Sequence, residues 1–194
     1  MFVFDIETLG KGSDSVILSM AAVHFDPNQK TSPQVMKDTA FFVKLQVKDQ
    51  VERLGRKMEK SAMEWWAKQC DNAKRRSFIP SEIDMTLEQG LDALQEWSDV
   101  YDPMDKCIIW ARGNLDQLVI DCAEESLDRP HVWTFNRWRD VRTAIDLLHN
   151  TTNGYCEVNY PGWDSNLEII KHDPIDDCLL DAMMLMYGKD KDGD

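Results

Sequence analysis

The chain has 194 residues, 43% of them hydrophobic, and a formal net charge of -13 at pH 7. This length and apolar fraction predict one folded domain with an ample core and exclude a long disordered chain. The negative charge argues against broad non-specific binding of nucleic acid, so an acidic chain would hold only a few nucleotides at a time. Five widely spaced cysteines, no basic leader and no membrane-length apolar run predict a protein of the reducing cytoplasm that does not bind membranes.

The first seven residues, MFVFDIE, predict a buried strand that ends in two carboxylates. Because side chains alternate along a strand, Asp5 and Glu7 share one face with Val3. Phe4 and Ile6 point to the other face. Two neighbouring acids repel each other, and a hard cation such as Mg²⁺ or Mn²⁺ between them would remove the repulsion. The alternative is that the strand simply ends here and both acids face water.

The following segments predict an alternation of strands and helices. Turn residues separate two apolar runs, 16–25 and 40–47, which form an antiparallel meander with the first strand. Residues 86–97 have the apolar spacing of an amphipathic helix. Residues 107–111, CIIWA, are short and apolar, as is typical of a central strand. This order of elements predicts an α/β fold.

Two adjacent tryptophans lie near the end of the first third of the chain. Residues 61–64, SAME, match a capping box that opens a helix carrying Trp65 and Trp66. Neighbouring side chains on a helix point about 100° apart, so one ring can be in the core while the other lies near the surface. Both rings being packing residues is one interpretation, and a platform that stacks a nucleic-acid base is the other.

A carboxylate follows the strand at 107–111. Asn114 is placed to cap a helix whose core-facing residues are Leu115, Leu118, Val119, Cys122 and Ala123. Asp116 falls in the first turn of this helix. The helix dipole favours an acid there in any protein. Ligands of open α/β sheets also gather where strands end, so Asp116 is a candidate site residue.

Three arginines lie within six residues: Arg137, Arg139 and Arg142. They would either bind phosphate groups or form surface ion pairs with the many acids of the chain. The segment that follows them, 143–149, is predicted to be helical. The sequence favours neither role for the arginines.

The sequence HDPIDD predicts the start of the last helix. Asp173 has the position of an N-cap and Pro174 that of the first helical residue. In this register His172 precedes the cap and Asp177 is the fourth helical residue, two positions that approach each other at a helix entry. A histidine and a carboxylate are therefore expected to meet at this helix terminus, while Asp176 is expected to cap the backbone.

Together these motifs resemble the DEDDh family of 3′-5′ exonucleases in the ribonuclease-H-like superfamily. The matching residues are Asp5 and Glu7 in FDIET, Asp116 after CIIWA, and His172 with Asp177 in the His-x-x-x-x-Asp spacing. SAMEWW, FNRWRDVRT and HDPIDDCLLDAMM are similar to the branch of phage-type exodeoxyribonuclease A and mycobacterial-type exoribonucleases. The resemblance spans nearly the whole chain. Leu115 departs from it, because many relatives have Phe there, which puts in doubt how a terminal base is packed.

The resemblance implies a ribonuclease-H-like mixed sheet, with antiparallel strands one to three plus parallel strands, flanked by helices. It implies one exonuclease domain over 1–188 and a disordered acidic tail over 189–194. The implied metal-binding catalytic acids are Asp5, Glu7, Asp116 and Asp177, with His172 as general base. The implied substrate contacts are Ile6, Thr8, Leu9, Trp66, Arg139 and Arg142.

The implied reaction is hydrolysis of single-stranded DNA from its 3′ end, with two Mg²⁺ or Mn²⁺ ions and release of nucleoside 5′-monophosphates. The setting is the cytoplasm of a bacterium or a phage-infected host. RNA is the alternative substrate, because the sequence does not reveal contacts to a 2′-hydroxyl. A different class of explanation is a non-catalytic acidic mimic of DNA, and a calcium-binding module is a third.

Overall fold

A five-stranded mixed sheet forms the centre of the computed structural model, which describes residues 1–29, 31–161, 163 and 169–189. The strands are β1 (Phe2–Thr8), β2 (Ile17–His24), β3 (Phe41–Lys44), β4 (Ile109–Ala111) and β5 (Trp138–Asp140). Their order is β3-β2-β1-β4-β5. The first three strands are antiparallel, whereas β4 pairs in parallel with β1 and with β5. The predicted mixed sheet is confirmed; the predicted tail, apart from Lys189, lies outside the described residues.

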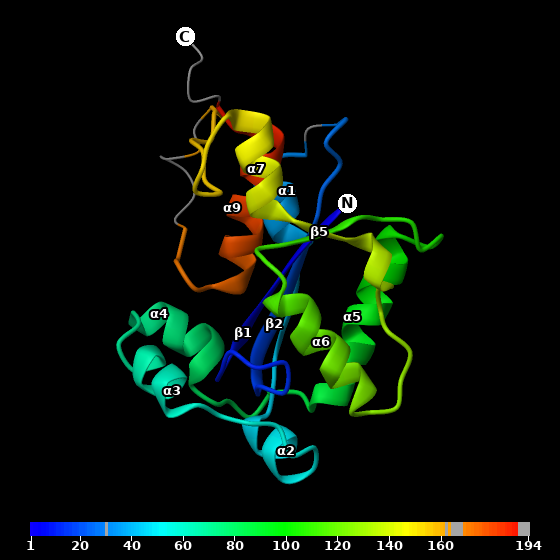
Figure 1. Cartoon of the computed structure of the whole chain (residues 1–194), viewed down its shortest axis with the longest axis vertical. Coiled ribbons are helices and arrows are strands. Elements are labelled where there is room, and N and C mark those ends of the chain that lie inside the picture. The colour runs from blue at the N-terminus through cyan, green and yellow to red at the C-terminus, as the bar shows by residue number, and fades with distance from the viewer. Residues whose placement is uncertain (30, 162, 164–168, 190–194) are drawn as a thin grey trace.

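Helices cover both faces of the sheet. They are α1 (Pro33–Asp38), α2 (Val47–Glu52), α3 (Lys60–Trp66), α4 (Asp71–Ala73), the π-helix η1 (Lys74–Phe78), α5 (Leu87–Tyr101), α6 (Leu115–Glu125), the 3₁₀-helix η2 (Phe135–Arg137), α7 (Val141–His149) and α9 (Pro174–Tyr187). Figure 1 shows α7 and α9 on one side of β1 and β2, with α5 and α6 on the other. In the part of the chain described, no helix combines the length and apolar character needed to cross a bilayer.

The alternation of side chains along β1 divides the core into two layers. Phe2 and Phe4 are fully buried against α5 and α6, whereas Val3 packs against α9. Burying one such phenylalanine contributes about 1.5–3 kcal/mol. Both neighbours of β1 are strands, so its backbone is fixed from both sides and the acids that it carries are held on a rigid support.

The third strand is shorter than the sequence predicts. It ends at Lys44, and the expected strand residue Val47 begins α2 instead. The side chain of Gln50 accepts from the backbone N–H of Ile17 at 2.8 Å and donates to its carbonyl at 2.7 Å. A side-chain amide thus replaces strand pairing beside Ile17, which the local apolar pattern does not reveal.

The predicted capping box at 61–64 is wrong. The helix α3 begins at Lys60, so Ser61 lies inside it, and its N-cap residue Glu59 makes no side-chain capping bond. The expected divergence of the two tryptophans is confirmed, because Trp66 is 1% exposed and Trp65 is 41% exposed.

The two longest helices of the middle segment follow the predicted spacing with one exception. Thr86 caps α5 through a complete capping box with Gln89, and the helix continues to Tyr101. In α6, Leu118 was expected in the core but is exposed, and Ile120 is buried in its place. The apolar face of α6 is therefore rotated slightly from the predicted one.

Candidate functional site

A cavity of about 250 Å³ lies where β1 ends. Its acidic and imidazole side chains are Asp5, Glu7, Asp116, His172, Asp177 and Asp181. They come from β1, α6 and α9 and from the residue before α9's N-cap. The five residues predicted to be catalytic therefore line one cavity, together with a fifth carboxylate that the sequence interpretation did not include.

The end of β1 aims the first two acids into this cavity. Asp5 pairs with Ala21 of β2, and Glu7 pairs with Ser19. The register then shifts between Glu7 and Thr8, and bulges of this kind re-aim side chains next to active sites. The strand reading of FDIE is confirmed, since both acids lie on the face of β1 opposite Phe4.

Asp116 enters the cavity from the first turn of α6. It is only 7% exposed, and the backbone N–H of Ile6 donates to its carboxylate. Burial, followed by the charge of Asp181, raises the pKa of Asp116 to about 7. The hydrogen bond from the β1 backbone ties this acid to the strand that carries the other two.

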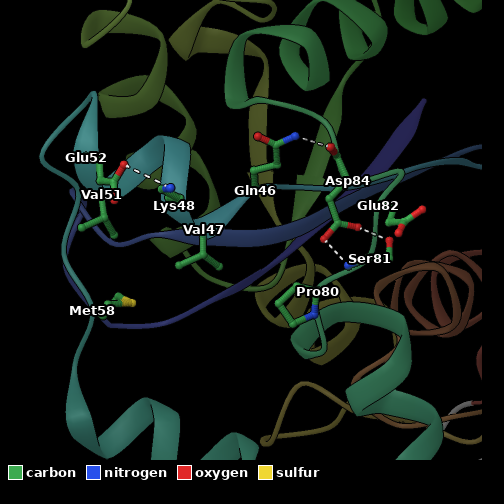
Figure 2. A pocket seen from close by; sticks show the side chains of 10 residues that line it. All are labelled: Gln46, Val47, Lys48, Val51, Glu52, Met58, Pro80, Ser81, Glu82 and Asp84. Carbon is green, nitrogen blue, oxygen red and sulfur yellow. Dashed lines mark hydrogen bonds and ion pairs between the residues drawn. The ribbon is translucent and has the colours of Figure 1, made fainter.

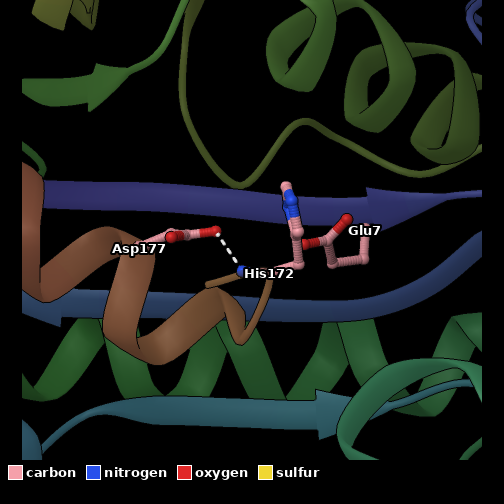
Figure 3. A group of neighbouring side chains, drawn as sticks. All are labelled: Glu7, His172 and Asp177. Carbon is pink, nitrogen blue, oxygen red and sulfur yellow. Dashed lines mark hydrogen bonds between the residues drawn. The ribbon is translucent and has the colours of Figure 1, made fainter. Parts of the chain in front are cut away.

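His172 and Asp177 meet at the start of α9, as the helix signals predict. The backbone N–H of His172 donates to Asp177 Oδ2 at 3.1 Å. Candidate ligand atoms of Glu7, His172 and Asp177 all lie within 4.8 Å of one another. Figure 3 shows Glu7 and Asp177 on either side of His172. The contact runs through the histidine backbone, which leaves its imidazole unbonded to Asp177 and directed elsewhere.

The backbone of His172 is held in an uncommon conformation, with φ of +65°. Non-glycine residues adopt this left-handed region only when their surroundings fix them there. Besides the bond to Asp177, the ring of Trp65 lies edge-on to the imidazole at a centroid distance of 4.7 Å. Burial, with the nearby charge of Lys171, lowers the pKa of His172, so the imidazole is neutral at neutral pH.

Burial and mutual repulsion destabilise the ionised forms of the carboxylates that line the cavity. Burial, and then the charges of Asp116 and Glu7, raise the pKa of Asp5 well above its usual value. Burial and the charge of Asp177 do the same for Glu7. A donor set of converging carboxylate oxygens with unbalanced charge fits a hard divalent cation. The residues present therefore suit Mg²⁺ or Mn²⁺.

This charge imbalance predicts how stability depends on pH in the metal-free protein. In the folded chain Asp116 and Asp177 have pKa values of about 7, compared with about 4 when unfolded. The contribution of these two carboxyl groups to the free energy of unfolding is therefore fully present below about pH 4. It is lost as the pH rises towards 7, by ~1.4 kcal/mol per pKa unit for each group. In EDTA, calorimetry should show a steeper fall in Tm over this range for the wild type than for Asp116→Asn. Equal slopes would contradict the buried, mutually repelling arrangement.

Cationic residues form a second part of the cavity wall that sequence reasoning largely missed. Arg112, Arg142 and Lys171 line it, and only Arg142 was predicted to be there. The Nε of Arg112 donates to both carboxylate oxygens of Asp181, at 3.1 and 3.2 Å. A signal for Asp181 was present in the sequence, because it lies four residues after Asp177 and so faces the same way on a helix.

Of the predicted substrate contacts, Arg142 lines the cavity, whereas the other five are not among its lining residues. Leu9 is buried in a core beside β2, and Ile6 is buried on the face of β1 opposite the acids. Thr8 Oγ1 donates to a neighbouring carbonyl. Arg139 lines an adjacent groove and donates to the carbonyls of residues 136 and 138.

The structure does not support the predicted contact between Trp66 and the substrate. Its ring is 1% exposed and stacks on Phe78, and its Nε1 donates to the carbonyl of Thr8 at 3.1 Å. A ring enclosed in this way cannot stack a nucleic-acid base. The packing interpretation holds for Trp66, and Trp65 is the member of the pair that reaches the site.

A larger hollow of about 540 Å³ lies between α2 and the segment 80–84. Figure 2 shows partners for two of its three carboxylates: Asp84 accepts from Ser81, and Glu52 pairs with Lys48. The remaining lining is largely apolar, with no convergence of acids. The candidate functional site is therefore the cavity at the end of β1 and not this hollow.

Comparison with known proteins gives three similarities. Residues 1–187 match the family model described as the 3'-5' exoribonuclease Rv2179c-like domain. The chain is 27% identical to an exodeoxyribonuclease of Enterobacteria phage T4 over 205 aligned residues, covering 96% of this chain and 87% of the phage protein. A crystal structure of the nuclease domain of 3'hExo, a DEDDh family member bound to rAMP, superposes with a TM-score of 0.57 at 10% identity, covering 95% of this chain and 90% of that one.

Proposed function

The chain belongs to the Rv2179c-like 3′-5′ exoribonuclease domain family and is a 3′-5′ exonuclease of the DEDDh type, and from this we propose that it degrades single-stranded DNA from the 3′ end. The products are nucleoside 5′-monophosphates. The observation that carries the proposal is that the four predicted acids, which come from three elements, line the same cavity as His172. DNA is favoured over RNA because the similarity to the phage exodeoxyribonuclease covers nearly the whole of both chains.

The four predicted acids are the residues that would hold the metal. As the resemblance to the DEDDh family implies, Asp5 would contribute to both of two ions, Glu7 and Asp177 would complete one site, and Asp116 would hold the second; all four line the same cavity. When bound, the two ions supply charge stabilisation at the attacking and leaving oxygens of the phosphodiester. Mg²⁺ and Mn²⁺ both suit this oxygen-only set.

His172 is assigned the role of general base. It stands beside Glu7 and Asp177, its lowered pKa leaves the imidazole neutral at neutral pH, and its ring is not hydrogen-bonded to Asp177. A neutral imidazole in this position accepts the proton from the attacking water. Trp65 and the backbone bond to Asp177 hold the ring in place.

RNA is a second candidate substrate, favoured by the description of the family model as an exoribonuclease domain. Discrimination between the two polymers depends on contacts to the 2′-hydroxyl. A non-catalytic mimic of DNA does not agree with the family, nor with acids that converge in one cavity rather than spread over the surface.

The testing experiment uses the purified protein with single-stranded DNA and RNA of the same sequence, labelled at either end. With Mn²⁺ we expect 5′-labelled DNA to shorten stepwise and 3′-labelled DNA to release a labelled mononucleotide at once. EDTA should stop both. Products that begin at the 5′ end, or release that persists in EDTA, would contradict the proposal. Faster degradation of the RNA than of the DNA would show that RNA is the preferred substrate.

We further propose that residues 1–188 act as one exonuclease unit followed by an acidic tail over 189–194. The family match ends at residue 187, which supports this division. No disulfide bond joins the five cysteines in the described part of the chain, and we propose that the protein works in the cytoplasm of a bacterial or phage-infected cell.

A further inference from the structure

The cavity wall away from His172 carries an aromatic ring that the reaction proposed above does not use. Tyr155 lines the cavity, and 51% of its surface is exposed. The guanidinium of Arg112 lies over this ring at 4.1 Å from the centroid. Large exposed aromatic side chains next to a polar cavity are natural stacking surfaces for nucleic-acid bases, because every base has a π-face.

Arg112 is held in a fixed position against one face of the Tyr155 ring. Its guanidinium forms a fork with Asp181 of α9, and its Nη1 donates to the carbonyl of Gly154 at 3.0 Å. Planar two-point pairing of this kind sets both position and orientation. The residue that supports Tyr155 is therefore itself anchored to the helix that carries Asp177.

The loop that carries Tyr155 is also fixed from the side of α7. Asp146 accepts from the hydroxyl of Thr151 at 2.6 Å and from the backbone N–H of Gly154 at 2.8 Å. Gly154 has φ of +70°, and a Cβ added there would lie 2.6 Å from Cβ of Arg142. Only glycine fits this approach, so the ring stands on a pre-organised turn, which reduces the entropy cost of binding.

The geometry of phosphoryl transfer indicates which nucleotide this wall would contact. The attacking and leaving oxygens lie roughly in line across the phosphorus. In the reaction proposed above, the water approaches from the side of His172, and the leaving oxygen is the 3′-oxygen of the preceding nucleotide. That nucleotide therefore lies on the side of the cavity away from His172.

The arrangement of charges places Tyr155 on that side. His172 groups with Glu7 and Asp177. Asp181, the partner of Arg112, lies four residues further along α9 than Asp177, a helix rise of about 6 Å. Tyr155 packs on Arg112, which pairs with Asp181, so the ring belongs to the part of the wall next to Asp181.

We propose that Tyr155, supported by Arg112, is the platform that stacks the base of the nucleotide on the 5′ side of the scissile phosphate. This inference rests on the proposed function of the same cavity. The platform is tolerant of base identity, because stacking uses the π-face and not the hydrogen-bonding edges. Through this stacking the enzyme binds the strand that remains after each cleavage.

The test removes the ring and the base separately. Two single-stranded substrates differ only in the penultimate nucleotide, which is either normal or abasic. For the wild type with Mn²⁺ we expect kcat/KM to fall about tenfold or more on the abasic substrate. Tyr155→Ala should lose a similar factor on the normal substrate and show no further loss on the abasic one. Tyr155→Phe should behave as the wild type, and Phe135→Ala, which removes an 81% exposed ring outside the cavity, should keep the full abasic effect.

A second readout does not depend on turnover. With 2-aminopurine at the penultimate position, His172→Ala in Ca²⁺ should quench the fluorescence on binding, and adding Tyr155→Ala should remove the quenching. Tyr155→Leu keeps apolar bulk without a flat ring and serves if the alanine variant is unstable. If Tyr155→Ala retains the wild-type abasic effect and quenching while the wild type releases mononucleotides, the platform alone is overturned. A wild type without metal-dependent 3′ release overturns the proposed function and the platform with it.

Discussion

Replacing Asp5 by asparagine is expected to lower turnover by roughly 10²–10³-fold or more while making the metal-free protein more stable. The two effects have one cause. Burial and the charges of Asp116 and Glu7 raise the pKa of Asp5, so its ionised form is stabilised only when cations enter the cavity. Asparagine keeps the shape of the side chain and removes the charge that both the metal and the repulsion depend on. Single-turnover kinetics with Mn²⁺ and thermal unfolding in EDTA measure the two results.

Asp84→Asn is the matched control for this variant. Asp84 is also buried, but it lies outside the cavity, where it accepts two hydrogen bonds from Ser81 and pairs with Lys44. Removing its charge should lower stability and leave turnover unchanged, the opposite pattern. Near-normal nucleotide release by Asp5→Asn, or a lower Tm in EDTA, would count against the role given to Asp5.

Replacing His172 by alanine is expected to lower kcat by roughly 10²–10⁴-fold, the usual contribution of a general base. The four acids that we propose as metal ligands remain, so binding of Mn²⁺ measured by calorimetry should change little. The pH profile separates base catalysis from a structural effect. The wild-type rate should level off once the imidazole is neutral, whereas the variant's residual rate should keep rising with pH, because hydroxide from solvent replaces the missing base.

His131→Ala is the control for the histidine variant. This imidazole follows the C-terminal end of α6, where its Nδ1 lies 2.8 Å from Glu124 Oε2. Its loss should leave both kcat and the shape of the pH profile as in the wild type. A His172→Ala enzyme with a wild-type plateau would show that another group accepts the proton.

The parts of the site that depend on local pattern could be predicted from the sequence. Alternation along β1 fixed the shared face of Asp5 and Glu7, and the Asp-Pro signal fixed the start of α9. The choice of Asp177 over Asp176 came from the family spacing. The structure gives a physical reason for it, since Asp176 is occupied by the backbone N–H of Ile170 and by Lys37.

The parts that depend on contacts between distant segments could not be predicted. Arg112 and Tyr155 are 43 positions apart and meet only because β4 and the loop after α7 are brought to the same edge of the cavity. The early end of β3 depends on Gln50, whose amide satisfies a backbone group 33 residues away. The same holds for Trp65 against His172. No periodicity within one segment carries that information.

The packing of α9 against β1 and β2 has a consequence for biosynthesis. Asp5 and Glu7 are translated well before His172 and Asp177, and α9 must dock on the sheet before the cavity exists. Until that helix clears the ribosome, the growing polypeptide has no assembled centre for cleaving phosphodiesters. Catalysis therefore depends on the tertiary contacts of α9 and cannot be a property of β1 alone.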